Sequence, residues 1–380
     1  MEPRPYKRNV LVIGGGVFGL TAAWALIRSG HRVRVLDRLS VPNPTGASVD
    51  QHRLVHPLHH ETSPICRGYS ELLISWEALW RDLNASYTVT TGALAVMPVD
   101  AVARLGSALA GDGIAHQVLD ARDLARRYPH LRFDARAAGV LAESAGFILA
   151  DRAMEALARW LIAHDVEIRG GAEVAAVGDA AEVLLRDGTR LRGDLLLIAA
   201  GAWSCDLVPH WRERVDVYRQ VVVYLDPPVR WAAAWQSTPA IVDFGTSDGP
   251  WAAPPRCGTA LKIAATGYRR PGDPSLPSDA RVMPFEIERI MPRFRDHIAE
   301  LDQYRAAGAR ACFYAADRAG AFRIDDLSAG SGGVWAIGAC AGQGFKWAPA
   351  VALAIAAFAD GRVSGTDLCR WTTAVDAVAA

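Results

Sequence analysis

Residues 10–19 read VLVIGGGVFG, and they predict the architecture of the N-terminal part of the chain. The apolar run over residues 10–13 predicts a short buried strand, and the glycines after it satisfy GxGxxG in the order strand, turn, helix. Gly14 permits the tight turn, Gly16 lets a pyrophosphate approach the backbone, and Gly19 allows close packing of helix on strand. The pattern predicts a unit that binds the ADP part of a dinucleotide at a helix N-terminus.

The residues that follow the glycines support this interpretation. Residues 20–29 carry apolar side chains at helical spacing, and Gly30 suits a helix C-cap. Residues 33–36 predict a second strand that ends at Asp37, whose carboxylate would accept hydrogen bonds from the adenosine ribose. A glycine turn without a ligand is the alternative, and the motif alone does not separate FAD from NAD.

Two later apolar runs, residues 194–201 and 334–338, also lead into glycine and predict parallel strands of the same sheet. Other alternating strand-like segments, at residues 87–97, 218–224 and 259–264, indicate a second domain. The predicted fold class is α/β, with a Rossmann-type domain and an inserted α+β substrate domain built on an antiparallel sheet. We expect a nucleotide-binding domain over 1–85, 145–215 and 306–380, and a substrate-binding domain over 86–144 and 216–305.

Composition excludes several classes of protein. The 41 basic residues equal the 41 acidic ones, so no broad field would attract nucleic acid or anionic lipid. The six cysteines are scattered singly, which argues against a zinc site or a disulfide scaffold and favours the cytoplasm. We expect no signal peptide and no membrane span, since the apolar stretch over residues 347–359 is well short of the ~20 residues a bilayer requires.

Four segments together resemble a known group of flavoproteins. They are the glycine motif with Asp37, GDLLLIAAGAW at 193–203, YRQ at 218–220 and GACAGQGFKWAP at 338–349. They occur in the order typical of the D-amino-acid-oxidase-type superfamily, and the chain is most similar to its monomeric sarcosine oxidase and N-methyltryptophan oxidase branch. The resemblance covers essentially the whole chain. It implies FAD as the cofactor, because the C-terminal glycine segment of that family brings backbone amides to the flavin.

The resemblance gives one cysteine a specific role. RACFYAADRAGAFRID, at 310–325, resembles the segment whose cysteine is bonded through sulfur to the flavin 8-methyl carbon in the sarcosine oxidase branch. It therefore implies covalent FAD at Cys312. From the residues alone, an unlinked buried cysteine is the alternative.

A lysine and an arginine are also matched by the resemblance. Lys262, in GTALKI at 258–263, resembles the family lysine that reaches a water near flavin N5 and activates oxygen. Its alternative is a surface lysine whose stem lies along apolar neighbours. Arg53 matches an arginine packed near the flavin.

Two positions depart from the family pattern. His56 stands where the family usually has an arginine that binds the substrate carboxylate, and Thr266 stands where sarcosine oxidases carry a pocket histidine. Lys346 is still suited to pair with a carboxylate as a compact point charge. We therefore expect a substrate other than sarcosine.

Four histidines, at positions 52, 56, 59 and 60, raise the question of a metal site. No carboxylate or cysteine stands at a convincing ligand spacing beside them. We expect pocket or surface histidines and no metal.

The expected function is an FAD-dependent amine oxidase that transfers hydride from a secondary amine or amino-acid-like substrate to flavin N5, with reoxidation by O₂ to H₂O₂. The alternatives are a flavin dehydrogenase that passes electrons to a quinone or carrier protein, and a non-enzymatic nucleotide-binding protein. We expect a monomer, with a dimer as the alternative.

The expected catalytic residues are Lys262, Lys346, Arg53 and His56. The expected cofactor-binding residues are Gly14, Gly16, Val17, Phe18, Gly19, Asp37, Arg38, Ser48, Arg53, Val174, Gly201, Trp203, Cys312, Gly342, Gly344, Phe345 and Lys346.

Overall fold

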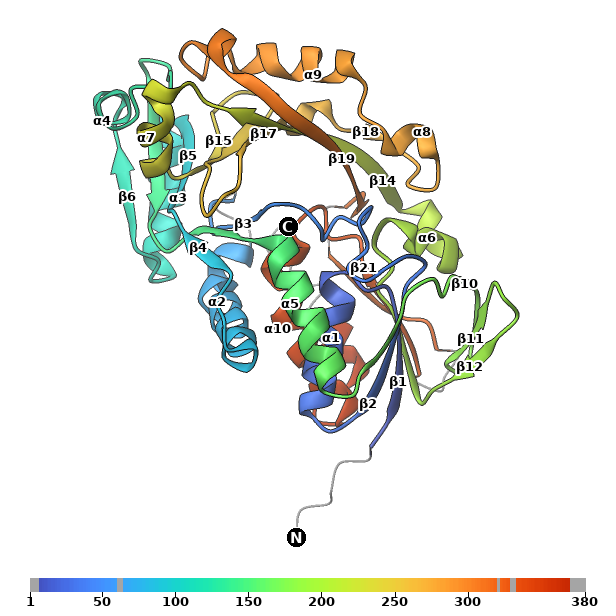
Figure 1. The fold of residues 1–380 in the computed structure, drawn as a ribbon. Coiled ribbons are helices and arrows are strands. Elements are labelled where there is room, and N and C mark those ends of the chain that lie inside the picture. The colour runs from blue at the N-terminus through green and yellow to red at the C-terminus, as the bar shows by residue number, and fades with distance from the viewer. Residues whose placement is uncertain (1–6, 60–63, 320–321, 329–332, 370–380) are drawn as a thin grey trace.

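A mostly parallel sheet forms one half of the molecule (Figure 1). The computed structural model describes residues 7–59, 64–319, 322–328 and 333–369. Within these ranges six strands form the sheet, and all neighbours are parallel except the first pair. The order is β20 (Arg323–Asp326), β21 (Val334–Gly338), β13 (Leu195–Ile198), β1 (Asn9–Ile13), β2 (Arg32–Leu36) and β9 (Glu167–Arg169).

The two faces of this sheet are covered differently, and strand β1 shows why. Val10 and Val12 belong to the core shared with helices α1 (Val17–Arg28), α5 (Ala150–Ala163) and α10 (Gly344–Ala359). Leu11 and Ile13 point to the other face and pack against a small sheet. Alternate side chains of a strand lie on opposite faces, so a continuous apolar run buries both. The small sheet consists of β10 (Val174–Gly178), β11 (Glu182–Leu185) and β12 (Arg190–Arg192).

A larger, mostly antiparallel sheet forms the other half and curves over the top of Figure 1. Nine strands of the described chain build it, and β19 pairs with β14 along the full length of that strand. The order is β18 (Arg270–Pro271), β14 (Val215–Asp226), β17 (Leu261–Ala265), β16 (Pro250–Ala253), β15 (Ala240–Asp243), β5 (Ala93–Pro98), β7 (Ala137–Ala142) and β6 (His116–Leu119), with β19 (Arg305–Asp317) beside β14.

The remaining elements connect the two halves or cover the larger sheet. A short sheet of β3 (Arg53–Val55), β8 (Gly146–Ile148) and β4 (Thr88–Thr90) lies between them. The other helices are α2 (Pro64–Leu83), α3 (Val99–Gly111), α4 (Ala121–Arg127), α6 (Ser204–Leu207), α7 (Val229–Ser237), α8 (Pro277–Ala280) and α9 (Pro284–Ile290).

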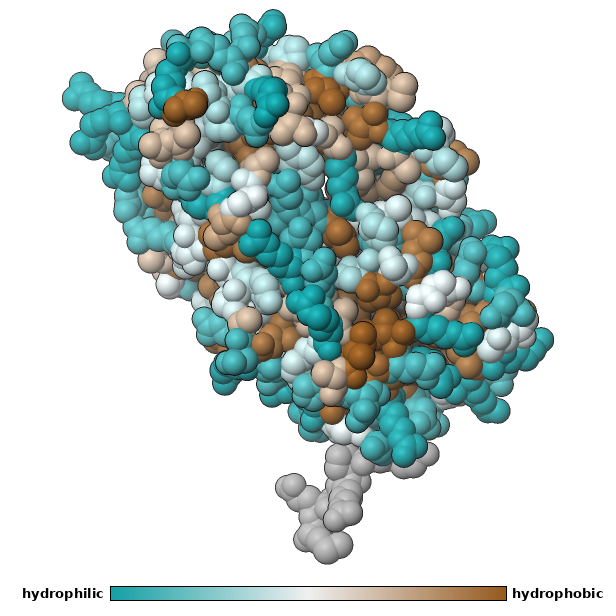
Figure 2. Space-filling view, viewed as in Figure 1, coloured by the Kyte–Doolittle hydropathy of each residue, from teal (hydrophilic) through white to brown (hydrophobic). Residues whose placement is uncertain are grey.

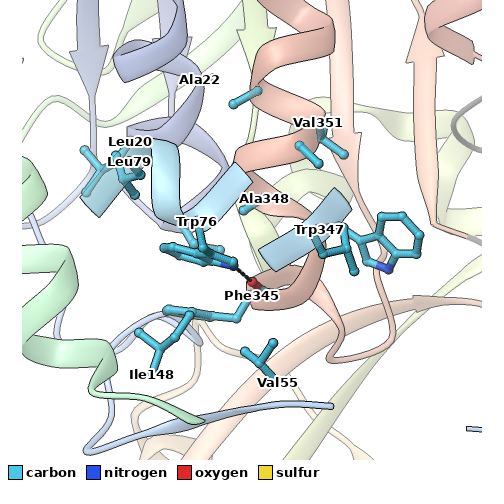
Figure 3. Packing of buried hydrophobic residues seen from close by; sticks show 14 of the residues in the cluster. Leu20, Ala22, Val55, Trp76, Leu79, Ile148, Phe345, Trp347, Ala348 and Val351 are labelled. Carbon is cyan, nitrogen blue, oxygen red and sulfur yellow. Dashed lines mark hydrogen bonds between the residues drawn. The ribbon is translucent and has the colours of Figure 1, made fainter. Parts of the chain in front are cut away.

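A core of aromatic and aliphatic side chains joins α2 to α10 (Figure 3). The Trp76 indole stacks on Trp80 and on Phe345, and its Nε1 donates a 2.8 Å hydrogen bond to the carbonyl of Phe345. That carbonyl lies in the first turn of α10, so the contact fixes the start of the helix. The side of α2 that carries Trp76 and Trp80 therefore packs in the core, as the helical spacing of these two residues predicts.

The predicted fold class is confirmed, with a parallel sheet and an antiparallel sheet in one chain. One predicted strand is wrong, because residues 87–97 form β4 and β5 with a break at Gly92. Gly92 has a φ of +73°, which glycine adopts without strain and which turns the chain between the two strands. Strand β19 belongs to the larger sheet, although its residues fall on the nucleotide-binding side of the expected boundary. The domain boundaries stay a prediction.

None of the helices in the described part of the chain has the length and apolar character needed to cross a bilayer. Figure 2 shows one face, where hydrophilic residues predominate and hydrophobic residues gather in separate groups.

The close contact of α1 with β1 gives a test of the glycine motif. A β-carbon added at Gly19 would lie 1.8 Å from the carbonyl oxygen of Gly14. Gly19→Ala should therefore push the helix off the strand and lower the free energy of unfolding by about 3 kcal/mol or more. Gly111→Ala is the matched control, because its β-carbon would meet nothing within 4 Å. Urea unfolding measures both; equal midpoints for the two variants would contradict this account.

Candidate active site

One cavity of about 610 Å³ collects the predicted site residues. It lies where the carboxyl ends of β1, β13 and β21 face strands β14, β17 and β19, the usual position of a ligand in an open α/β sheet. Every expected site residue lines it except Gly19, whose role is the helix contact described above. Its size and mixed lining suit a cofactor together with a small substrate.

The glycine turn forms one end of the cavity. Asp37 accepts a 2.8 Å hydrogen bond from the amide of Gly15 and further bonds from Leu39 N and Asn43 Nδ2, each 3.0 Å long. Its carboxylate therefore holds the turn in place, a task the sequence did not predict, and its ribose contact stays a prediction. The Ser48 hydroxyl accepts a 2.8 Å bond from Val17 N at the start of α1.

Several features of the wall fit a dinucleotide. The Trp203 indole Nε1 is buried and has no partner among the described groups, so a ligand acceptor would satisfy it. The Arg38 guanidinium lies 5.4 Å from the Trp203 ring centroid, on the same side of the cavity. Gly342 has a φ of +81° and meets nothing within 4 Å, so its backbone is open to the cavity. These residues fit the ADP and flavin ends of FAD.

The cysteine and the arginine that the sequence singled out meet across the cavity. Cys312 lies on β19 opposite Gln220 of β14, and only 7% of its surface is exposed. The Nη2 atom of Arg53, from β3, lies 3.6 Å from the Cys312 sulfur. Lys346 and Phe345 lie in the first turn of α10, which points its N-terminus at the same region.

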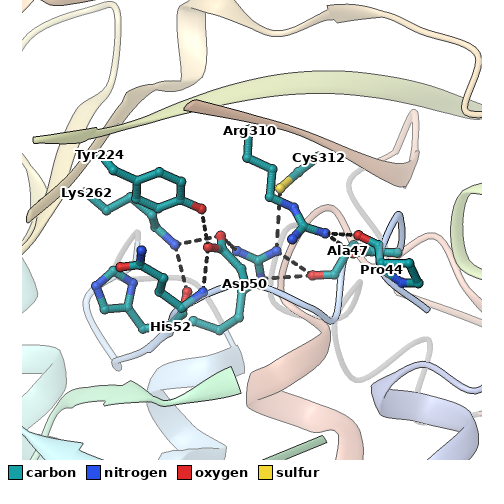
Figure 4. Close-up of polar contacts among 11 residues, drawn as sticks. Pro44, Ala47, Asp50, His52, Tyr224, Lys262, Arg310 and Cys312 are labelled. Atoms are coloured by element: carbon teal, nitrogen blue, oxygen red, sulfur yellow. Dashed lines mark hydrogen bonds and ion pairs between the residues drawn. The ribbon is translucent and has the colours of Figure 1, made fainter. Parts of the chain in front are cut away.

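A buried ion cluster surrounds Lys262 (Figure 4). Its Nζ atom donates to Asp50 Oδ2 at 2.9 Å and to the His52 carbonyl at 2.7 Å, and its side chain is 2% exposed. Asp50 also accepts from Arg53 and, at 2.5 Å, from the Tyr224 hydroxyl. Burial tends to raise the pKa of Asp50, but the charges of Lys262 and Arg53 outweigh it and lower that pKa far below its usual range. The predicted alternative, a surface lysine, is wrong.

Three of the four histidines line the same cavity. Burial, with help from the charge of Lys262, lowers the pKa of His52 to about 3. The rings of His56 and His59 stack at 4.6 Å, and burial followed by the charge of Lys346 lowers the pKa of both. His59 Nε2 accepts from Lys346 Nζ at 2.7 Å. The three imidazoles are therefore neutral at pH 7.

These histidines leave polar atoms unsatisfied. Both ring nitrogens of His52 and the Nδ1 of His56 are buried without a partner in the described chain. His60 lies outside the described residues. No group of three metal-ligating side chains occurs among the residues described. Thr266 is exposed at the rim of the cavity.

Asp50 and Tyr224 are members of the site that the sequence did not indicate, and His59 was expected only as a pocket or surface histidine. Asp50 stands in DQHR beside the predicted Arg53, yet a single aspartate in a polar loop carries no signal for burial. Tyr224 stands opposite Lys262 in the β14–β17 register, which pairing of the two predicted strands could have indicated.

Comparisons with known proteins agree with this architecture. The profile of the family described as FAD dependent oxidoreductase matches residues 9–358. Peroxisomal sarcosine oxidase of Mus musculus is 24% identical over 226 residues, which cover 54% of this chain and 58% of that protein. The chain thus spans little more than half the length of such relatives. N-methyl-L-tryptophan oxidase of Salmonella dublin is 24% identical over 95% of this chain and 97% of its own.

Solved structures show the same fold. NikD, an unusual amino acid oxidase essential for nikkomycin biosynthesis, superposes with a TM-score of 0.79 at 21% identity, covering 96% of this chain and 97% of its own. Glycine oxidase from Bacillus cereus gives a TM-score of 0.78 at 18% identity, covering 95% and 97%.

The neutral state of His52 predicts a dependence of stability on pH. The unfolded chain binds a proton at this histidine near its ordinary pKa of 6.5, whereas the folded protein binds it only near 3. Stability is therefore lost as the pH falls from 6.5 towards 3, by about 4 to 5 kcal/mol for this group. His52→Asn should flatten the fall in urea midpoint between pH 6.5 and 4. His210→Asn, at a side chain 55% exposed, is the control. Parallel curves for all three proteins would contradict the assignment.

Proposed function

Since the chain belongs to the family of FAD-dependent oxidoreductases, we propose that it is an amine oxidase that converts a secondary amine or an amino-acid-like amine to an imine. The observation that carries the proposal is the lysine cluster. A buried ammonium, Lys262, faces the same cavity as Cys312 and the N-terminus of α10. Three separate segments of the chain thus place a positive charge, a thiol and a helix N-terminus around one cavity. A site that bound ADP alone would not need these groups.

The residues that would hold FAD follow the length of the cavity. Gly14, Gly16 and Asp37 would hold the ADP part, and Gly342 and Gly344 would face the flavin. When bound, FAD would supply the two-electron acceptor for hydride from the carbon next to the amine nitrogen. The protein would orient that carbon and keep water away from it.

The charges of the cavity support a neutral amine as the reacting form. Lys262 and Lys346 both line the cavity, and their ammonium groups disfavour a protonated amine between them. Loss of hydride requires a free electron pair on that nitrogen. The neutral His52 and His56 present unpaired ring nitrogens that can hydrogen-bond a substrate without adding charge.

The names of the relatives support the reaction class. Sarcosine, N-methyl-L-tryptophan and glycine are amino acids, two of them N-methylated, and each is named in an oxidase similar to this chain. Lys346 would pair with a substrate carboxylate, and the His56–His59 stack in place of an arginine favours a planar or bulkier substrate over sarcosine. Reoxidation by O₂, a cytoplasmic location and a monomeric state belong to the proposal as well.

Flavin absorbance gives a direct test of the reaction. Without oxygen, a panel of N-methylated, cyclic and aromatic amino acids should include one that bleaches the bound flavin in a stopped-flow instrument. Admitting air should restore the colour and release one H₂O₂ for each amine oxidised. Rapid dye reduction with little peroxide would instead identify a dehydrogenase, and no bleaching by any amine would remove the proposed function.

Lys262→Met should separate the two half-reactions. The variant loses the buried positive charge that would promote reaction with O₂, so reoxidation should slow at least tenfold more than reduction. Arg310→Met, which removes a cation that bonds Pro44 at the surface, is the matched control. Equal slowing of reduction and reoxidation would remove the role assigned to Lys262.

Covalent attachment at Cys312 has its own test. The 3.6 Å contact of Arg53 with the sulfur supports this atom as the bond to the flavin 8-methyl carbon. Acid-denatured protein should give a yellow pellet, and Cys312→Ser should release all colour to the supernatant. The control is Cys257→Ser, because Cys257 is exposed and lies outside the cavity lining. A colourless wild-type pellet would contradict the bond.

A further inference from the structure

Lys262 is held by a carboxylate that neither the sequence motifs nor the reaction require. Asp50 lies in the loop before β3, and its side chain has no exposed surface. Its Oδ2 faces Lys262 Nζ and Arg53 Nη1, while its Oδ1 accepts from the Tyr224 hydroxyl and from the amide of Gln51 at 2.7 Å. Both oxygens are thus fully used, and the carboxylate has one possible orientation (Figure 4).

The loop that carries Asp50 is itself fixed on both sides. The Gln51 side chain accepts a 2.8 Å bond from Ala260 N, beside the start of β17, and the Asp50 carbonyl accepts a 2.9 Å bond from Asp151 N in α5. Lys262 and Tyr224 are direct cross-strand neighbours in β17 and β14. The position of the carboxylate is therefore set by two strands of the larger sheet and by α5.

We propose that Asp50 is a positioning residue that fixes the Lys262 ammonium at one point of the cavity wall and supplies its counter-charge. An ammonium carries three N–H donors, and two of those of Lys262 are taken by Asp50 and the His52 carbonyl within the described chain. The third has a direction that the other two determine. The inference deepens the role proposed for Lys262 in the amine oxidase.

Asp50 acts here as a fixed charge and not as a proton carrier. The two adjacent cations hold its pKa so low that it stays ionised at neutral pH. Burial, followed by the charge of the same carboxylate, raises the pKa of Tyr224 beyond its ordinary range. Neither group exchanges a proton with the cavity near pH 7. Burial lowers the pKa of Lys262, and the charge of Asp50 opposes that shift. The other titratable groups facing Lys262 are Arg53 and Cys312, with Tyr224 and the neutral His52 beside them.

The chain offers a clean measurement because it contains only three lysines, at positions 7, 262 and 346. Acetic anhydride acylates the neutral amine alone, and mass spectrometry of peptides gives the rate at each lysine. Exposed Lys7 is the reference within every molecule. In the purified wild-type protein the rate at Lys262 should rise with pH and level off once the amine is fully neutral. In Asp50→Asn it should level off at least one pH unit earlier and exceed the wild-type rate tenfold at pH 7.

Tyr224→Phe is the matched control, because it removes a bond to Asp50 and leaves the charge in place. Its pH profile should coincide with that of the wild type. If Asp50→Asn only loosened the site, the acylation rate at Lys262 would rise at every pH, but the pH at which that rate levels off would stay the same. The same profile in Asp50→Asn and in the wild type would overturn the proposal. No turnover is needed, so the proposed amine oxidation can fail while this result stands.

A double-mutant cycle covers the case in which Asp50→Asn does not fold or Lys262 resists the reagent. Lys262→Met combined with Asp50→Asn removes the cation together with its counter-charge. The double variant should have a higher urea midpoint than Asp50→Asn alone. If Asp50→Asn lowered the urea midpoint equally in the wild type and in Lys262→Met, Asp50 would stabilise the loop and not the position of the lysine. That result would overturn the proposal.

Discussion

The contact between α1 and β1 is the constraint on which the rest of the site depends. A β-carbon on Gly19 would lie 1.8 Å from the carbonyl oxygen of Gly14, and one on Gly14 would lie 2.4 Å from the carbonyl oxygen of Ala199, so neither position tolerates a side chain without moving the backbone. The helix therefore starts directly above the carboxyl end of β1, and the hydrogen bond that Val17 N donates to the Ser48 hydroxyl fixes that start. Because β13 and β21 are parallel to β1 in the same sheet, their ends reach the same edge. The cavity lies along this edge.

The other wall of the cavity comes from strands whose order along the chain gives no hint of their proximity. Strand β14 pairs with β17 on one side and β19 on the other, so Tyr224, Lys262 and Cys312 come together from three places. Asp50 from the loop before β3 meets two cations, and their attraction offsets the burial of all three groups. Removal of Asp50 would leave both cations without their counter-charge.

The spacing of apolar residues and glycines was enough to predict those helices, strands and turns that depend on residues close together in the sequence. The strand, turn and helix at residues 10–28 follow from apolar spacing and glycine, and the strand at 334–338 repeats that logic. Asp50 could not be predicted, because its burial depends on Lys262, which lies 212 residues further along the chain. His59 was not separated from its neighbours, since its contact with Lys346 requires α10 to be in place. The break at Gly92 was missed because alternation continues across it.

The cavity contains lysine, although lysine is rare in this chain, and the difference between lysine and arginine explains why. Of the 41 basic residues only three are lysines, so arginine is the ordinary cation of this chain, yet two of those three line the cavity. A guanidinium is always protonated and spreads its charge over a planar fork, whereas an ammonium is compact and its pKa responds to burial. Lys262 can therefore place one charge at one point, under the control of Asp50. Arginine at the same position would need more space and would not respond to its neighbours in this way.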